Sequence, residues 1–372
     1  MTTGHVNLPN SPHPHEPPHP PEPSHPHEPP EPPEPHEPPE PHEPPEPCRP
    51  APPAPSSPGP VRRALRIVAV AATLPYLTLK TMWVAGSHVG IPEGSILREG
   101  TLFFAVANGA TLLMDAFLVV LVLALTQPWG LRIPSWLMAV PAFVAMGLLT
   151  PILTAFPLQQ LLRLFGTAPD AAERAAREPF LDPWVFNVVY TGFSIQALAL
   201  AALFVPYARQ RWGHLWRQGA GPVRGARAVA VPAAAGALAL AAIQTYWAFG
   251  GTGGMTAAML AQRSADTVMI GAVHAACALA GGAGALLLAF GGGRGGGGGR
   301  PARGPLALAW VGGAAAASWG AWLSLAVLAP PPGGDPEMAP TGVLQLAYAG
   351  QMITGLLVAV VVTRFLTARR PG

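Results

Sequence analysis

The feature that most constrains this 372-residue chain is a series of apolar blocks, each about 20 residues long. A helix of that length crosses the hydrocarbon core of a bilayer, because each residue adds about 1.5 Å. Only 11% of the residues are charged, against about a quarter in a soluble domain. The blocks predict an all-α polytopic membrane helix bundle with about eight transmembrane helices. We expect the spans at residues 64–85, 102–126, 136–157, 184–205, 228–249, 268–290, 306–329 and 341–366.

The arginines predict the orientation of these spans. Cytoplasmic loops of membrane proteins carry an excess of Lys and Arg. If the N-terminus is cytoplasmic, alternate loops hold fifteen arginines inside and five outside. The inside set is Arg62, Arg63, Arg66, Arg132, Arg209, Arg211, Arg217, Arg224, Arg227, Arg294, Arg300, Arg303, Arg364, Arg369 and Arg370, and the outside set is Arg98, Arg163, Arg174, Arg177 and Arg263. We therefore expect a multi-pass plasma-membrane protein with both termini in the cytoplasm.

Residues 1–60 are expected to form a disordered, proline-rich cytoplasmic tail. The hexapeptide HEPPEP occurs at 27–32, 36–41 and 42–47. Dense proline removes backbone donors and favours extended polyproline II structure over helix or sheet. The His and Glu side chains could buffer metal weakly, but periodic spacing alone supplies no closed coordination shell, so a solvated spacer is the simpler interpretation and no metal site is expected.

Two patterns recur along the chain and suggest two similar halves, 61–227 and 228–372. Lys80-x-x-Trp83-x-x-Gly86 returns 164 residues later as a Gln-x-x-Trp-x-x-Gly sequence, and a Tyr-x-Gly-x-x-Ile pattern at Tyr190 returns 158 residues later at Tyr348. Four crossings per half would leave both halves in the same orientation, the parallel type of repeat that some transporters have. The chain would then be a 4+4 parallel repeat.

Several polar side chains fall within the expected spans, where they are costly unless they face a cavity, a partner or another helix. Lys80 is the only lysine and could snorkel to the interface, pair with Asp115 or contact a ligand. Asp115 is too deep and too short to snorkel, so it would pair, take up a proton or face water. The candidate set lies at or outside the midplane and predicts an outward-facing polar cavity lined by Lys80, Asn108, Asp115, Gln244 and His274.

Two tryptophans beside this set, Trp83 and Trp247, are expected to anchor their helices at the membrane interface, where indole rings concentrate. Residues 74–94, LPYLTLKTMWVAGSHVGIPEG, together with eight expected helices and the near absence of lysine, resemble an uncharacterised actinobacterial family of multi-pass integral membrane proteins. That resemblance implies a membrane location and carries no activity or site.

Three classes of function fit these observations. A small-solute permease or exporter is favoured by the repeat and the polar cluster. A non-catalytic scaffold or sensor component would use the tail to bind a cytoplasmic protein. A lipid-handling enzyme is disfavoured because no Ser-His-Asp set, HExxH sequence or cysteine pair occurs. We expect contact with the lipid bilayer, a small solute as ligand, no cofactor and no nucleic acid.

The orientation can be tested with the two cysteines, Cys48 in the tail and Cys277 in the sixth expected span. In whole cells Cys48 should resist a membrane-impermeant maleimide and react after permeabilisation, because the tail is expected inside. Cys277 should react slowly in both conditions. Labelling of Cys48 from outside intact cells would reverse the orientation.

Overall fold

The computed structural model describes residues 59–99, 102–165, 181–217, 223, 225–291, 302–329 and 336–369. Within these residues the chain forms no strand and has eight helical segments long and apolar enough to cross a membrane. This confirms the expected all-α bundle of a multi-pass integral membrane protein. The tail lies outside the described residues up to position 58, so its disorder and its partner stay predictions.

The first span consists of two helices, and seven single helices form the others. They are α1 (Pro60–Ala71) with α2 (Leu74–Val84), α3 (Leu102–Thr126), α4 (Ser135–Leu164), α6 (Pro183–Arg217), α7 (Ala226–Ala248), α9 (Ala265–Phe290), α10 (Arg303–Leu328) and α11 (Gly342–Thr367). Short helices lie in the connections, at η1 (Ile96–Glu99), η2 (Pro128–Leu131), α8 (Ala257–Ala261) and η3 (Pro336–Met338). The expected spans agree within a few residues, except that α4 and α6 are longer at their C-terminal ends.

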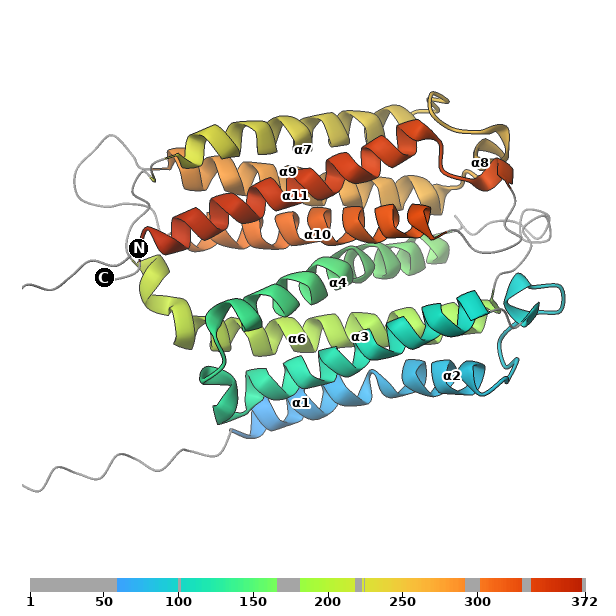
Figure 1. Ribbon diagram of the computed structural model, residues 1–372, viewed down its shortest axis with the longest axis horizontal. Coiled ribbons are helices and arrows are strands. Elements are labelled where there is room, and N and C mark those ends of the chain that lie inside the picture. The colour runs from blue at the N-terminus through green and yellow to red at the C-terminus, as the bar shows by residue number, and fades with distance from the viewer. Residues whose placement is uncertain are drawn as a thin grey trace, which may run out of the picture. The chain divides into compact units, whose positions relative to one another are not determined.

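The helices pack as two neighbouring groups (Figure 1). α1, α2, α3, α4 and α6 contact one another in the first group, and α7, α9, α10 and α11 form the second. Most contacts between the groups are made by α4, which packs against both α10 and α9. The interface between the groups is therefore formed mainly by α4 on one side and by α9 and α10 on the other.

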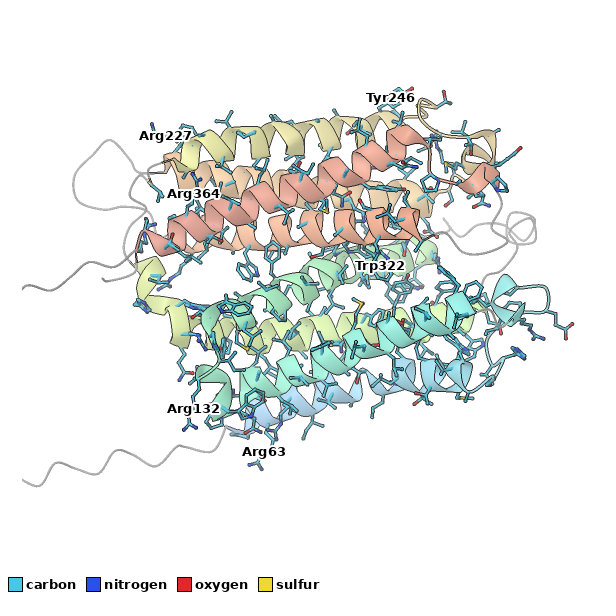
Figure 2. The ribbon with its side chains drawn as sticks, viewed as in Figure 1. Arg63, Arg132, Arg227, Tyr246, Trp322 and Arg364 are labelled. Atoms are coloured by element: carbon cyan, nitrogen blue, oxygen red, sulfur yellow. The ribbon has the colours of Figure 1, made fainter. Side chains whose placement is uncertain are left out.

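Four arginines mark one end of this bundle. Arg63, Arg132, Arg227 and Arg364 all lie at the left in Figure 2, whereas Tyr246 lies at the other end. We call these the basic end and the opposite end. The structure thus places at one end four of the arginines that the alternating loops assign to the same side, as the positive-inside pattern requires.

The first span is broken between α1 and α2, and proline accounts for the break. Pro75 has no N–H, so the carbonyl of Ala71 loses its partner four residues on. The Thr73 N–H and the Thr73 hydroxyl both donate to the Val70 carbonyl, at 3.1 Å and 2.7 Å. Such added hydrogen bonds help at a break within a bilayer, because no water is present there to bond with backbone groups. The span therefore consists of two rods joined at Ala72 and Thr73.

α4 stays helical through Pro141, Pro151 and Pro157. The carbonyl that loses its helical partner at Pro151 is that of Gly147, and side-chain donors bond to the carbonyls on either side of it. The Thr150 hydroxyl donates to Met146 at 2.6 Å, and the Trp319 indole of α10 donates to Leu148 at 3.0 Å. A neighbouring helix thus adds a hydrogen bond beside the proline, where the helix lacks one of its own.

α10 approaches its neighbours in the second group through small residues. A side chain at Gly312 would overlap the backbone of Cys277 and Gly281 on α9. On the α11 side, Gly355 packs directly against the backbone of Ala317. Helices in lipid associate through such close contacts, because apolar burial alone gives no advantage over lipid tails. The second group is therefore held together by backbone proximity.

The loops after α2 and α7 have the same structure. Gly86 and Gly250 adopt φ of 88° and 92°, and the next residue's N–H closes the helix end by bonding to the carbonyl five residues earlier, 2.9 Å in both loops. The indole of Trp83 donates to the Val89 carbonyl at 2.8 Å, and that of Trp247 donates to Gly253 at 3.0 Å. Equivalent residues of the two loops are 164 positions apart, which is the spacing at which the Trp-x-x-Gly pattern recurs in the sequence.

Substitution of Gly86 or Gly250 by Ala should destabilise the protein by about 1–2 kcal/mol each, because L residues are strained in the left-handed region. No atom lies within 4 Å of an added Cβ at either position, so the loss would come from the backbone alone. Thermal unfolding in detergent measures the effect. Gly109→Ala on α3, which is equally uncrowded but helical, should instead gain about 0.5–1 kcal/mol. Equal effects at the three positions would contradict this explanation.

Candidate functional site

Lys80 points from α2 into the first helix group and is only 8% exposed. Its ammonium group donates to Asn108 Oδ1 at 2.8 Å and to Thr111 Oγ1 at 2.7 Å, both on α3. The face of the Tyr76 ring lies 5.0 Å from Nζ and adds a cation–π contact. Lys80 therefore does not snorkel: its charge is satisfied by polar and aromatic groups inside the protein.

Asp115 lies one helical turn beyond Thr111 on the same face of α3 and is also 8% exposed. Its carboxyl oxygen Oδ2 is enclosed and accepts no hydrogen bond. Lys80 and Asp115 form no ion pair within 4.0 Å, because the ammonium is directed to Asn108 and Thr111. The ammonium of Lys80 on α2 and the carboxyl of Asp115 on α3 are thus neighbours without direct contact.

The other two candidate residues lie in the second helix group. The side-chain oxygen of Gln244 on α7 lies against Gly271 of α9, where an added Cβ would meet it at 2.6 Å. His274 Nδ1 on α9 accepts a 3.2 Å hydrogen bond from the side-chain amide N–H of Gln351 on α11. The five candidate residues therefore do not line one vestibule: Lys80, Asn108 and Asp115 meet inside the first group, while Gln244 and His274 belong to the second.

Trp83 and Trp247 use their indole nitrogens inside the protein, in the loop hydrogen bonds described above. Trp247 is in addition buried. These two residues fix the ends of their helices by bonding to loop carbonyls.

A cavity of about 570 Å³ lies between the two groups, toward the opposite end. It is lined by α4, α6, α9 and α10, and of the five candidate residues only His274 reaches it. The lining residues are Pro151, Ile152, Ala155, Phe156, Gln159, Arg163, Leu181, Pro183, Phe186, Asn187, Tyr190, Asp266, Ile270, Val273, His274 and Trp319. The volume falls in the range typical of small-molecule sites, about 300–1,000 Å³.

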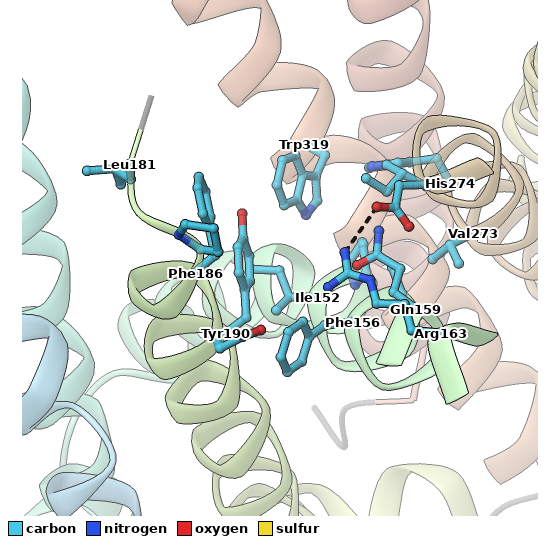
Figure 3. Close-up of a pocket in the computed structure, with 16 residues that line it drawn as sticks. Ile152, Phe156, Gln159, Arg163, Leu181, Phe186, Tyr190, Val273, His274 and Trp319 are labelled. Carbon is cyan, nitrogen blue, oxygen red and sulfur yellow. Dashed lines mark hydrogen bonds and ion pairs between the residues drawn. The ribbon is translucent and has the colours of Figure 1, made fainter. Parts of the chain in front are cut away.

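Aromatic rings form one wall of the cavity (Figure 3). The Tyr190 ring stacks with Phe156 of α4, with centroids 5.7 Å apart, and with Phe186 one turn away on α6, 6.1 Å apart. Across from them, Trp319 meets the His274 ring edge to face at 5.4 Å. The indole of Trp319 is held by its bond to Leu148, so this part of the wall is fixed in orientation.

Charged and amide groups occupy the rim. Arg163, in the last turn of α4, forms an ion pair of 3.1 Å with Asp266 in the first turn of α9. Both side chains are partly exposed, 40% and 31% respectively. The amide of Gln160 donates to Asn187 Oδ1 at 3.1 Å. The cavity therefore combines an aromatic wall with one positive and one negative group at its mouth.

At the basic end the two groups close on each other through aromatic rings. Trp310 of α10 packs edge to face against Phe143 of α4 at 5.2 Å and stacks on Phe204 of α6 at 5.8 Å. Between these rings and the cavity, Gly147 of α4 lies directly against Ala314 and Ser318. The interface is thus filled at the basic end and hollow toward the opposite end.

Comparison of this chain with protein-family models, with curated proteins and with solved structures found no match. The geometry of the cavity and of the buried polar group is therefore what a functional argument has to rest on.

Sequence reasoning missed most of the cavity residues. Arg163 and Asp266 fall in what the apolar blocks marked as loop or loop edge, and Phe156, Phe186 and Trp319 are indistinguishable from ordinary apolar residues of a span. A signal existed in Asn187 and Tyr190, polar groups that fall within the outer part of the fourth expected span. The missing information was which helices face one another.

The contact between Lys80 and Asn108 can be measured with a double-mutant cycle. Lys80→Met and Asn108→Ala should show a coupling free energy of about 1–3 kcal/mol in unfolding measured in detergent. Each single variant removes the same hydrogen bond to the charged lysine, so the double variant cannot lose it a second time. Lys80→Met combined with Gln244→Ala, in the other helix group, should be additive. Additivity for the Lys80–Asn108 pair would contradict the geometry.

Proposed function

We propose that this integral membrane protein is a small-solute permease or exporter, and that the cavity between its helix groups is the solute site. The observation that carries the proposal is a hollow interface, with its volume of about 570 Å³, closed by packed rings at the basic end. A site between two helix groups that is open toward one side and closed toward the other is what alternating access requires. Rocking of one helix group against the other would close the open end of the cavity and open the closed end.

We propose further that the halves 61–227 and 228–372 are parallel repeats. The recurring loops support this, since their glycine conformations and tryptophan hydrogen bonds recur at one offset. With the basic end in the cytoplasm of a plasma-membrane protein, the cavity faces outward and both termini lie inside. The resemblance to an actinobacterial family and the alternative role as a scaffold stay predictions, and the latter depends on the tail.

The chemistry of the cavity favours a zwitterion with an aromatic or other large apolar body. Arg163 and Asp266 neutralise each other across the mouth, and a zwitterion can replace that single contact by two, carboxylate to Arg163 and ammonium to Asp266. The rings of Phe156, Tyr190 and Trp319 would hold the apolar body. A solute with one net charge would leave one of the two rim groups unpaired.

Counterflow in proteoliposomes tests this assignment. Vesicles loaded with unlabelled L-phenylalanine should take up labelled L-phenylalanine faster than protein-free vesicles, and phenylacetate, which lacks the ammonium group, should not exchange. Arg163→Gln and Asp266→Asn should each reduce exchange about tenfold or more, since each removes one charged hydrogen bond.

The matched control is Arg132→Gln, which removes an exposed arginine at the basic end and should leave exchange unchanged. Absence of L-phenylalanine counterflow with folded protein would contradict the proposal. An equal loss in Arg132→Gln would show that net charge, and not the cavity, controls the rate.

A further inference from the structure

The buried polar group on α3 has one unsatisfied member. Asp115 is 8% exposed and lies within the span, with Oδ2 enclosed and accepting no hydrogen bond. Among the acidic residues that the structure describes, it is the one placed far from a helix end; the others are Glu93, Glu99, Asp182, Asp266 and Glu337. A carboxyl group in this position is costly and is retained in membrane helices chiefly where it carries an ion or a proton.

The nearest cation does not neutralise Asp115. Two of the three N–H groups of Lys80 are used by Asn108 and Thr111, and the Tyr76 ring lies beside the ammonium. The Thr111 hydroxyl donates in turn to carbonyls of its own helix, at 3.1 Å to Ala107 and at 3.0 Å to Asn108, so it is oriented to accept from the lysine. The ammonium thus has a complete set of partners one turn away from the carboxyl.

The titratable groups around Asp115 are few. α2 contributes Lys80 and Tyr76, both of which interact electrostatically with the carboxyl, and α6 contributes Tyr190, which faces Tyr76. From α1, Arg62 donates to the Leu125 carbonyl near the other end of α3. α4 contributes only Arg163, which is paired with Asp266, and η2 has no titratable side chain. Among the described residues Lys80 is therefore the cation close enough to pair with the Asp115 carboxylate when its proton leaves.

We propose that Asp115 is a proton-binding site, and that Lys80 pairs with its carboxylate when the proton is absent. Binding of the proton is coupled to the solute cavity. The coupling, though not the site, rests on the proposed permease function. In the protonated state the proton sits on the carboxyl and Lys80 binds Asn108 and Thr111, the lysine contacts that the structure has. When the O–H bond breaks, the proton leaves and the electron pair stays on the carboxylate. Lys80 then moves one turn along α3, about 6 Å, and pairs with it.

A proton fits this site better than a metal cation. Asn108 and Thr111 would be the remaining oxygen ligands for a cation at Asp115, and both are occupied by Lys80. A fixed ammonium beside the site would also repel a second cation. A proton needs a single acceptor atom, which Oδ2 provides.

The site is joined to the cavity by contacting rings. Tyr76, on the same helix as Lys80, packs edge to face against Phe193 of α6 at 5.0 Å, and Phe193 meets Tyr190 at 6.3 Å. Tyr190 is the central ring of the cavity wall (Figure 3). α2 is a short rod separated from α1 by the break at Ala72 and Thr73. A shift of Lys80 along α3 would move α2, and the ring contacts would transmit that movement to the wall.

Infrared difference spectroscopy tests the proton site without transport. Full-length protein in lipid nanodiscs should show the carbonyl band of a protonated carboxylic acid that disappears as the pH is raised and shifts in heavy water. Asp115→Asn should abolish this band, Asp115→Glu should retain a titrating band, and Glu93→Gln, an exposed loop carboxyl, should leave it unchanged. Absence of the band from the wild-type protein, or its persistence in Asp115→Asn, would overturn the site.

A pH gradient tests the coupling. In proteoliposomes at low internal buffer, an imposed gradient should drive accumulation of L-phenylalanine, up to about tenfold per pH unit for one proton per solute. Asp115→Asn should lose this accumulation, and replacement of sodium by choline should not. Accumulation that persists in Asp115→Asn, or that requires sodium, would overturn the coupling. If the Asp115 band is present but no solute exchanges, the proton site holds and the permease function is what fails.

Discussion

Water is absent from the core of a bilayer, so every backbone N–H and C=O in a span needs a partner within the protein, and the structure depends on how this is met at the prolines. At Pro75 the first span divides, and the Thr73 hydroxyl donates to the Val70 carbonyl, next to the freed one. At Pro151 the indole of Trp319 reaches across from α10 to the Leu148 carbonyl. The first place separates off the helix that carries Lys80, and the second begins the stretch of α4 that lines the cavity.

The cavity follows from two kinds of helix packing. Within the second group, Gly312 and Gly355 let backbones touch, which leaves no room for a ligand. Between the groups, α10 presents large rings, and Trp310 fills the gap against Phe143 and Phe204. These large rings keep the two helix groups apart. Farther along the interface no rings of this size among the described residues fill the space, and a cavity remains. The hollow lies beyond the large rings, at the end opposite Arg63, Arg132, Arg227 and Arg364.

Charged side chains are handled differently at the cavity rim and in the buried polar group. Arg163 and Asp266 pair directly at a partly exposed rim, where such contacts contribute little to stability and can be exchanged for a ligand. Lys80 and Asp115 are buried, and the lysine is bound to neutral oxygens while the carboxyl is left alone. Leaving a buried carboxyl unpaired costs free energy that a purely structural role would not need.

The sequence by itself determined the helices, their number and their approximate ends, because crossing a bilayer imposes a length and an apolar composition that can be read locally. It also determined the loops at Gly86 and Gly250, since a left-handed glycine and a tryptophan donor are properties of a short segment. It placed Asn108 and Asp115 on one helix face and offered Lys80 as a partner for Asp115, but it put Gln244 and His274 in the same cavity. Only the tertiary structure decided that α4, α9 and α10 enclose the hollow and that Phe156, Tyr190 and Trp319 form its wall. Those residues are apolar or aromatic like any lipid-facing residue of a span, and what separates a wall from a lipid face is which helix packs opposite it.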